Sequence, residues 1–180
     1  SQKFLEFIKE YGKESGLFKD IEINSFGDNP ASPFELKIVS EDKSLNICNV
    51  GYGVSQSLPI LLELFAREKN TWYAIQQPEV HLHPRAQAAL GDVFFNLALQ
   101  EKKRFFIETH SDFIVDRFRL NVNKNKDSEV ESQVIFFEQK DGVNTAHPIE
   151  ILPNGKYQDG MPESFYSFFV KEDLSILGLQ

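Results

Sequence analysis

The stretch WYAIQQPEVHLHP, from Trp72 to Pro84, decides the fold. Its first four residues are apolar and predict a buried strand, which turns polar at Gln76, Gln77 and Glu79. The proline that ends the stretch suits the first position of a helix, and an apolar stripe with helical spacing follows over residues 86–98. The stretch therefore predicts a strand, a polar loop and a long helix in succession.

The same pattern recurs downstream. Residues 104–107 predict a second strand, polar residues 108–112 follow it, and a further helix contains Phe113, Ile114 and Phe118. Two successive units of strand, polar loop and helix are typical of an α/β fold with a largely parallel sheet flanked by helices.

The helix before the first unit is expected to have Ser55 as its N-cap and to end near Arg67, with Pro59 in its first turn. Its predicted apolar face consists of Leu58, Leu61, Leu62 and Phe65.

The flanks of this core follow simpler patterns. We expect a helix over residues 3–11 ended by Gly12, strands over 18–23 and 34–39, an exposed loop over 121–132, antiparallel strands over 133–137 and 143–151, and a terminal helix opened by Pro162. The chain is thus expected to have three segments: 1–48, the helix and edge strands that lead into the core; 49–124, the core; and 125–180, terminal strands and a C-terminal extension.

Composition excludes several classes of protein. The 180 residues are 41% hydrophobic, enough for one core, and the net charge of −8 disfavours charge-driven nucleic-acid binding by this chain alone. One cysteine, Cys48, excludes an internal disulfide, and no apolar run is long enough to cross a membrane. The start, SQKFLE, lacks the pattern of a signal peptide. We expect a cytoplasmic protein and a start that is the interior of a longer chain.

Two polar clusters follow the predicted strands, where ligands bind in open α/β sheets. One contains Gln76, Gln77 and Glu79, and the other runs from Glu108 to Asp112. As an alternative, His81, His83 and His110, with Glu79 and Asp112, have the chemistry of a zinc or iron site in a metal-dependent hydrolase.

A glycine-containing turn, residues 49–56, leads into the first core helix and could direct backbone N–H groups at an anion. It lacks the third glycine of a dinucleotide-binding fingerprint, and the phosphate-binding pattern G-x-x-x-x-G-K-[ST] is missing from the chain.

Three strings taken together resemble a known family. They are VGYGVSQ at residues 50–56, IQQPEVHLHP at 75–84 and FIETHS at 106–111. In this order they resemble the C-terminal half of an ABC-type AAA ATPase, from the bacterial group related to the overcoming-lysogenization-defect (OLD) proteins and, more distantly, to SMC-type DNA-repair ATPases. The resemblance implies a P-loop NTPase fold that binds and hydrolyses ATP with Mg²⁺ as a homodimer, coupled to a DNA-related or defence activity.

The resemblance also implies roles for individual residues. Gly51, Gly53, Ser55 and Gln56 match the signature loop, which contacts the γ-phosphate of ATP held by the opposite protomer. Gln76, with Glu79, matches the Mg²⁺-binding position of Walker B; Gln77 or Glu79 would orient the attacking water. Residues 81–85 match the D-loop, and His110 matches the switch histidine that senses the γ-phosphate.

Two departures from the family pattern bear on activity. Walker A is missing, which implies that the N-terminal half lies upstream of Ser1 or on another chain, and that this chain alone is inactive. Gln76 is neutral where an acidic residue is usual. Three explanations are open. Glu79 takes the place of the missing acidic residue, or the protein is a slow ATPase or a catalytically inactive dimerisation module, or Gln76 is an engineered substitution.

Overall fold

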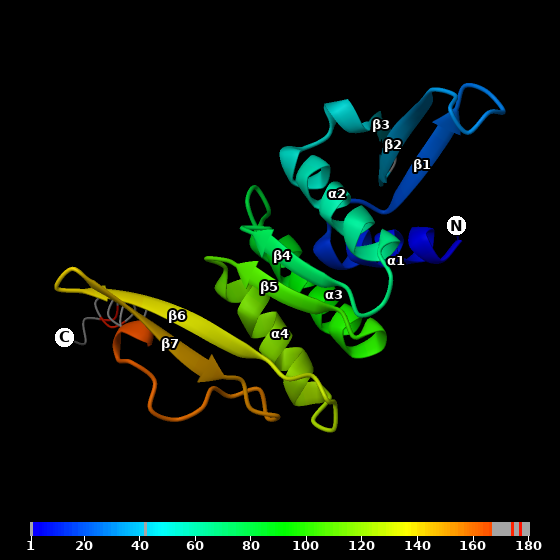
Figure 1. Ribbon diagram of the computed structural model, residues 1–180. Coiled ribbons are helices and arrows are strands. Elements are labelled where there is room, and N and C mark those ends of the chain that lie inside the picture. Colours follow the sequence, from blue (N-terminus) through cyan, green and yellow to red (C-terminus); the bar gives the residue numbers. More distant parts are fainter. Residues whose placement is uncertain (1, 42, 167–173, 175–176, 178–180) are drawn as a thin grey trace. The chain divides into compact units, whose positions relative to one another are not determined.

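The computed structural model describes residues 2–41, 43–166, 174 and 177. The chain divides into two compact units, residues 1–121 and 122–180, and each is described by itself (Figure 1). The division into three segments that the sequence suggests stays a prediction.

The first unit contains the α/β core. In chain order its elements are α1 (Gln2–Ser15), β1 (Asp20–Ser25), β2 (Phe34–Ser40), β3 (Lys43–Asn46), the 3-10 helix η1 (Ile47–Asn49), α2 (Tyr52–Ala66), β4 (Trp72–Gln76), α3 (Pro84–Glu101), β5 (Arg104–Glu108) and α4 (Asp112–Lys124), whose last turn falls in the second unit. β1, β2 and β3 form an antiparallel sheet, and β4 pairs with β5 in parallel. The predicted strand, loop and helix units are confirmed.

α3 lies at the centre of the core. Its apolar stripe is buried, and the side chains of Tyr73, Ile75, Phe105 and Ile107 pack against this cluster from one face of the β4–β5 sheet. Phe94 of α3 lies 5.2 Å from Phe105, ring centre to ring centre. Alternate residues of a strand point to opposite faces, so one face of each strand is fixed by α3.

The opposite face of the β4–β5 sheet is open. Trp72 and Phe106 are 57% and 62% exposed, and their rings stack with centres 5.6 Å apart. The Arg104 guanidinium lies 4.9 Å from the centre of the Trp72 ring. The prediction that residues 72–75 form a buried strand was therefore wrong: the apolar run lies in a strand with one covered and one open face.

The end of α1 differs from the prediction because Gly12 has a packing role. A Cβ at Gly12 would lie 2.4 Å from the ring of Phe18, so glycine is needed inside the helix. The helix continues to Ser15, and Gly16 (φ +73°) ends it in the left-handed conformation. Arg85 of α3 donates hydrogen bonds to the carbonyls of Glu14 (2.7 Å) and Lys13 (2.8 Å).

α2 begins four residues earlier than the prediction. Gly51 is its N-cap, Ser55 lies inside the first turns, and Pro59 is in the helix interior. The residues facing the core are Val54, Ser57, Leu58, Leu61 and Leu64, whereas Leu62 is 52% exposed. Because Gly51 and Gly53 are typical of a loop, the predicted helix began too late. The predicted apolar face was therefore assigned to partly different residues.

α4 extends into the stretch expected to be a loop. Asn121 donates a hydrogen bond to Asp92 of α3 at 2.7 Å, and Arg117 pairs with the same carboxylate at 2.7 Å. A polar residue can therefore stabilise the helix where the sequence pattern suggested an exposed loop.

The second unit is built on a hairpin of β6 (Gln133–Lys140) and β7 (Val143–Glu150), with Asp141 and Gly142 both at positive φ in the turn. Phe136 contacts Phe165, and Phe165 contacts Tyr157, each edge to face with ring centres 5.2 Å apart. The predicted antiparallel pair is confirmed. Of the helix expected after Pro162, residues 164–166 are helical and the continuation lies outside the described residues.

Within the part of the chain that the structure describes, no helix has the length and apolar character needed to span a membrane.

Gly91 of α3 sits against α4 and supplies a test of this packing. A Cβ there would lie 2.6 Å from the carbonyl oxygen of Ile114 and 3.0 Å from the Cβ of Arg117. Glycine to alanine within a helix usually stabilises by about 1 kcal/mol. At this contact we expect Gly91→Ala to lower the free energy of unfolding by about 1–3 kcal/mol in urea denaturation, because the two helix backbones must separate.

Asn96→Ala on the exposed side of α3 is the control, expected within about 0.5 kcal/mol of the wild type. A Gly91→Ala variant as stable as the wild type would contradict the close approach of α3 and α4.

Candidate functional site

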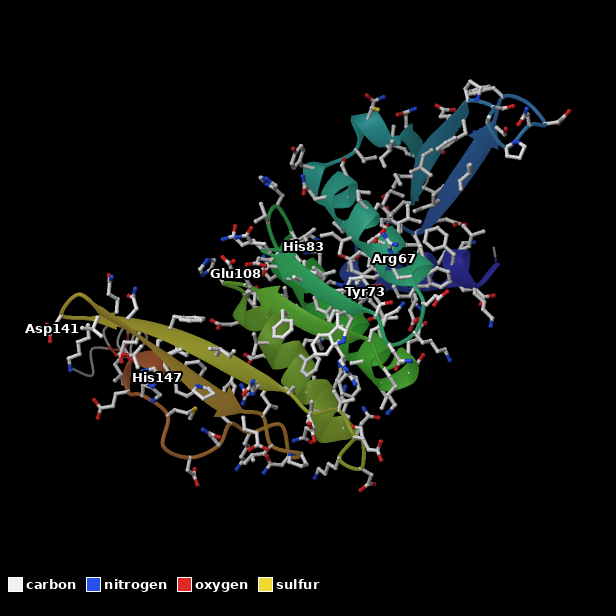
Figure 2. All side chains as sticks on the ribbon, viewed as in Figure 1. Arg67, Tyr73, His83, Glu108, Asp141 and His147 are labelled. Carbon is white, nitrogen blue, oxygen red and sulfur yellow. The ribbon has the colours of Figure 1, made fainter. Side chains whose placement is uncertain are left out.

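The candidate site lies where β4 and β5 end. The two strands run parallel in the register that places Gln76 opposite Glu108, so both polar clusters emerge at the same edge of the sheet. Figure 2 shows Glu108 and His83 at this end of the two strands. Apolar and aromatic residues form the strands, and the register is fixed because a slip of one residue would turn the buried face outward.

Gln76 and Glu108 contact each other directly. The Gln76 side-chain nitrogen donates a hydrogen bond of 2.9 Å to a carboxylate oxygen of Glu108. Both side chains are exposed and belong to the open face of the sheet. Sequence reasoning placed Glu108 in a polar cluster but gave it no role, because only the register shows that it faces Gln76.

The loop after β4 is bent by two residues with left-handed backbones, Gln77 (φ +46°) and His81 (φ +65°). The Gln77 amide donates to the Glu108 carbonyl at 2.8 Å, which extends the strand ladder by one residue. The Leu82 amide donates to the Glu79 carbonyl at 2.9 Å and closes the turn. Non-glycine residues in this conformation carry a strain cost of about 1 kcal/mol or more, and such residues cluster at functional sites.

Glu79 ties this loop to the loop after β5. It is 9% exposed, and one carboxylate oxygen accepts a 2.7 Å hydrogen bond from the backbone N–H of His110. The other carboxylate oxygen is buried and has no hydrogen-bond partner in the described structure. Half of the Glu79 carboxylate is thus engaged in holding the backbone at His110.

A second link runs between the same two loops. The Ser111 hydroxyl donates to the side-chain oxygen of Gln87 at 2.6 Å, and the Gln87 side-chain nitrogen donates to the Leu82 carbonyl at 2.7 Å. The Ser111 oxygen also accepts from the Ile114 amide at 3.2 Å and so caps α4. Sequence reasoning missed Gln87, and it placed Ser111 in a polar cluster without assigning it the cap. The serine three residues before the apolar Ile114 was the available signal for that cap.

The glycine turn lies against the same loop. A Cβ at Gly53 would approach the carbonyl oxygen of His81 to 2.9 Å, so glycine is what permits this contact. The rings of Tyr52 and His81 meet edge to face with centres 4.7 Å apart. No side chain caps the start of α2, and Gln56 is exposed beside Ser55. The structure therefore brings the first turn of α2 to residues 79–83.

The metal-site alternative is not supported by the geometry. Among the described residues, no three His, Cys, Asp or Glu side chains are grouped so that they could hold a metal ion. His81, His83 and His110 are each exposed, and the buried carboxylate of Glu79 bonds to backbone. Burial and the charge of Asp116 raise the pKa of Asp112, which disfavours the charged form that a metal ligand needs. His83 precedes α3 at the N-cap position, but its side chain makes no capping hydrogen bond.

Comparisons with known proteins show the family and the fold of the chain. The family described as AAA ATPase domain matches residues 2–115. An OLD nuclease from Thermus scotoductus is 27% identical over 143 residues, covering 74% of this chain and 27% of the relative. The chain therefore spans about a quarter of the length of that relative.

Solved structures show the fold. One, from work on ATP-driven dimerization and DNA-stimulated activation of SMC ATPases, superposes with a TM-score of 0.60 at 11% identity over 96% of this chain and 91% of that chain. The Smc head domain of Pyrococcus yayanosii, with a coiled coil and joint, gives 0.57 at 13% identity over 82% of this chain and 27% of that chain.

These likenesses confirm the prediction of a partial ABC-type ATPase core of mixed α/β class. The chain belongs to the AAA ATPase domain family, with sequence similarity to an OLD nuclease and the fold of SMC ATPase heads.

Proposed function

We propose that this chain supplies the signature loop, the Walker B-like strand and the switch histidine to a composite ATP site in a dimeric ATPase. The observation that carries the proposal is the meeting of three motifs at one end of the β4–β5 sheet. Glu79 bonds to the backbone at His110, and Gly53 packs against the carbonyl of His81. Three segments far apart in the sequence thus form one continuous edge.

The start of α2 is suited to a phosphate group. The start of a helix leaves backbone N–H groups without partners in the helix, and the helix dipole favours negative charge there. In α2 the Val54 N–H already bonds to the Gly51 carbonyl at 3.1 Å. Gly51, Gly53, Ser55 and Gln56 would contact the γ-phosphate of an ATP molecule held by the opposite protomer. No acidic residue lies in the first turn of α2 to repel the phosphate.

The strand ends fit a hydrated Mg²⁺ ion, which prefers oxygen donors and keeps several waters. Gln76 offers an amide oxygen, and Glu79 retains one carboxylate oxygen without a partner. When bound, Mg²⁺ would neutralise charge on the phosphates. Gln77 can orient a water but cannot accept its proton, and the exposed His110 imidazole can donate a hydrogen bond to a γ-phosphate.

The proposed partners would supply the Walker A motif, which this sequence lacks. The phosphate-binding loop would come from a Walker A half, in cis or on another chain, and the open face with Trp72 and Phe106 leaves apolar surface for it. Association of two copies would complete the ATP site. The OLD nuclease and the DNA-stimulated SMC ATPases among similar proteins support coupling to DNA or to a partner effector protein.

A second candidate function is a catalytically inactive ATPase-like dimerisation module. Neutral amides at both Gln76 and Gln77 favour it, because neither can act as a general base.

The isolated chain is expected to show no ATP turnover above a buffer blank in a phosphate-release assay, because its sequence lacks the Walker A pattern that would hold the triphosphate. Addition of the Walker A half, with Mg²⁺, should restore ATP binding measured with a fluorescent ATP analogue. Robust hydrolysis by the 180-residue chain alone would overturn the proposal of a shared site.

Gln76→Glu in the complete protein separates the two candidate functions. If the site is catalytic, a second carboxylate at this strand end, beside Glu108, should raise the hydrolysis rate by about tenfold or more at saturating Mg²⁺, because it strengthens binding of the ion. The control is Gln100→Glu, an exposed glutamine of α3 that lies outside the strand ends. No gain in hydrolysis with the variant still folded would favour the inactive module.

Glu79→Ala tests the link between the two loops. Loss of the acceptor for the His110 amide should speed hydrogen exchange at that amide by about ten- to a hundredfold, since one charged hydrogen bond contributes about 1.5–3 kcal/mol. Glu6→Ala, which removes an exposed carboxylate of α1, is the control. If the His110 amide exchanges at the same rate in Glu79→Ala as in the wild type, the hydrogen bond from this amide to Glu79 does not hold the two loops together.

A further inference from the structure

The contact between Gln76 and Glu108 bears on how Mg²⁺ would bind at the strand ends. The two residues are register partners at the last position of each parallel strand, and their side chains bond on the open face of the sheet. The Gln77 amide also donates to the carbonyl of Glu108, which fixes the backbone there. Hydrogen bonds to its side chain and to its main-chain carbonyl thus both fix the position of Glu108.

The hydrogen bond determines which atoms remain available. Gln76 donates through its nitrogen, so its amide oxygen stays free as an acceptor, and Glu108 uses one of its two carboxylate oxygens. Among the described residues, no Lys or Arg side chain forms an ion pair with Glu108. Arg104, two residues back on the same face, places its guanidinium over the Trp72 ring. Glu108 therefore has no ion-pair partner among the described residues.

We infer that Glu108 supplies, from the neighbouring strand, the carboxylate that the Mg²⁺-binding position at Gln76 lacks, and that Gln76 is its positioning residue. One carboxylate and one amide oxygen at adjacent strand ends are a donor set that Mg²⁺ accepts alongside water and phosphate oxygens. The inference rests on the proposed ATP site and adds to it a residue that the family resemblance did not assign.

Divalent-cation binding tests the inference without any measurement of turnover. The probe is Mn²⁺, titrated into the ¹⁵N-labelled chain and followed by paramagnetic broadening in NMR spectra. In the wild type, the Gln76 side-chain NH₂ and the Glu108 backbone amide should broaden first, and excess Mg²⁺ should reverse the effect. For E108Q we expect that about tenfold more Mn²⁺ is needed, because one full charge beside the ion is removed.

Exchanging the residues at positions 76 and 108 distinguishes a loss of cation binding from a general structural effect of the substitution. In Q76E/E108Q the carboxylate moves to β4 and the amide to β5, so the hydrogen-bonded pair and its net charge are kept, and Mn²⁺ binding should return to within about threefold of the wild type. E22Q is the matched control, since Glu22 is an exposed strand carboxylate that bonds to Ser44, and it should leave the broadening unchanged.

Broadening that persists in E108Q, or that centres away from the strand ends in the wild type, would overturn the inference. These readouts use Mn²⁺ alone, so they stand apart from the ATP-binding assay. Failure of ATP binding with the Walker A half would remove the proposed function, whereas an unchanged Mn²⁺ response in E108Q would remove only the role of Glu108.

Discussion

The parallel pairing of β4 with β5, in the register that sets Gln76 opposite Glu108, is the constraint on which the site depends. Parallel neighbours need a crossover, and α3 provides it while burying one face of both strands. Because both strands end at the same edge, the loop after each one starts beside the other. Without this register, Glu79 could not reach the backbone of His110, and the Gln76 amide would not meet a carboxylate.

Sequence reasoning could predict the order of the elements, because apolar periodicity and Pro84 mark the strand and the helix without tertiary information. It could not assign the parts played by Glu79, Gln87 and Ser111. An acidic residue after a strand has the same sequence signal whether it faces a substrate or bonds to a buried amide, and only the fold decides. Boundaries failed where glycine has a packing role: Gly12 and Gly53 are needed for close approach to Phe18 and His81.

The two hydrogen-bonded links between the loops restrain the same pair of segments. Glu79 joins residue 79 to residue 110, and Gln87 joins residues 82 and 111, so the segment after β4 and the segment after β5 are connected at two points. Two attachments restrict rotation as well as separation. The loop at His81, where Tyr52 and Gly53 of α2 also make contact, is thus joined to the segment at His110 by these hydrogen bonds.

Trp72 is the one tryptophan of the chain, and it sits half-exposed on the open face of the sheet, against Phe106 and under Arg104. Its indole therefore gives the protein a built-in optical reporter at a single defined place. Anything that covers this face would remove water from the indole and change both the wavelength and the quenching of its emission. The assembly state of the sheet can be followed in this way without attaching a label.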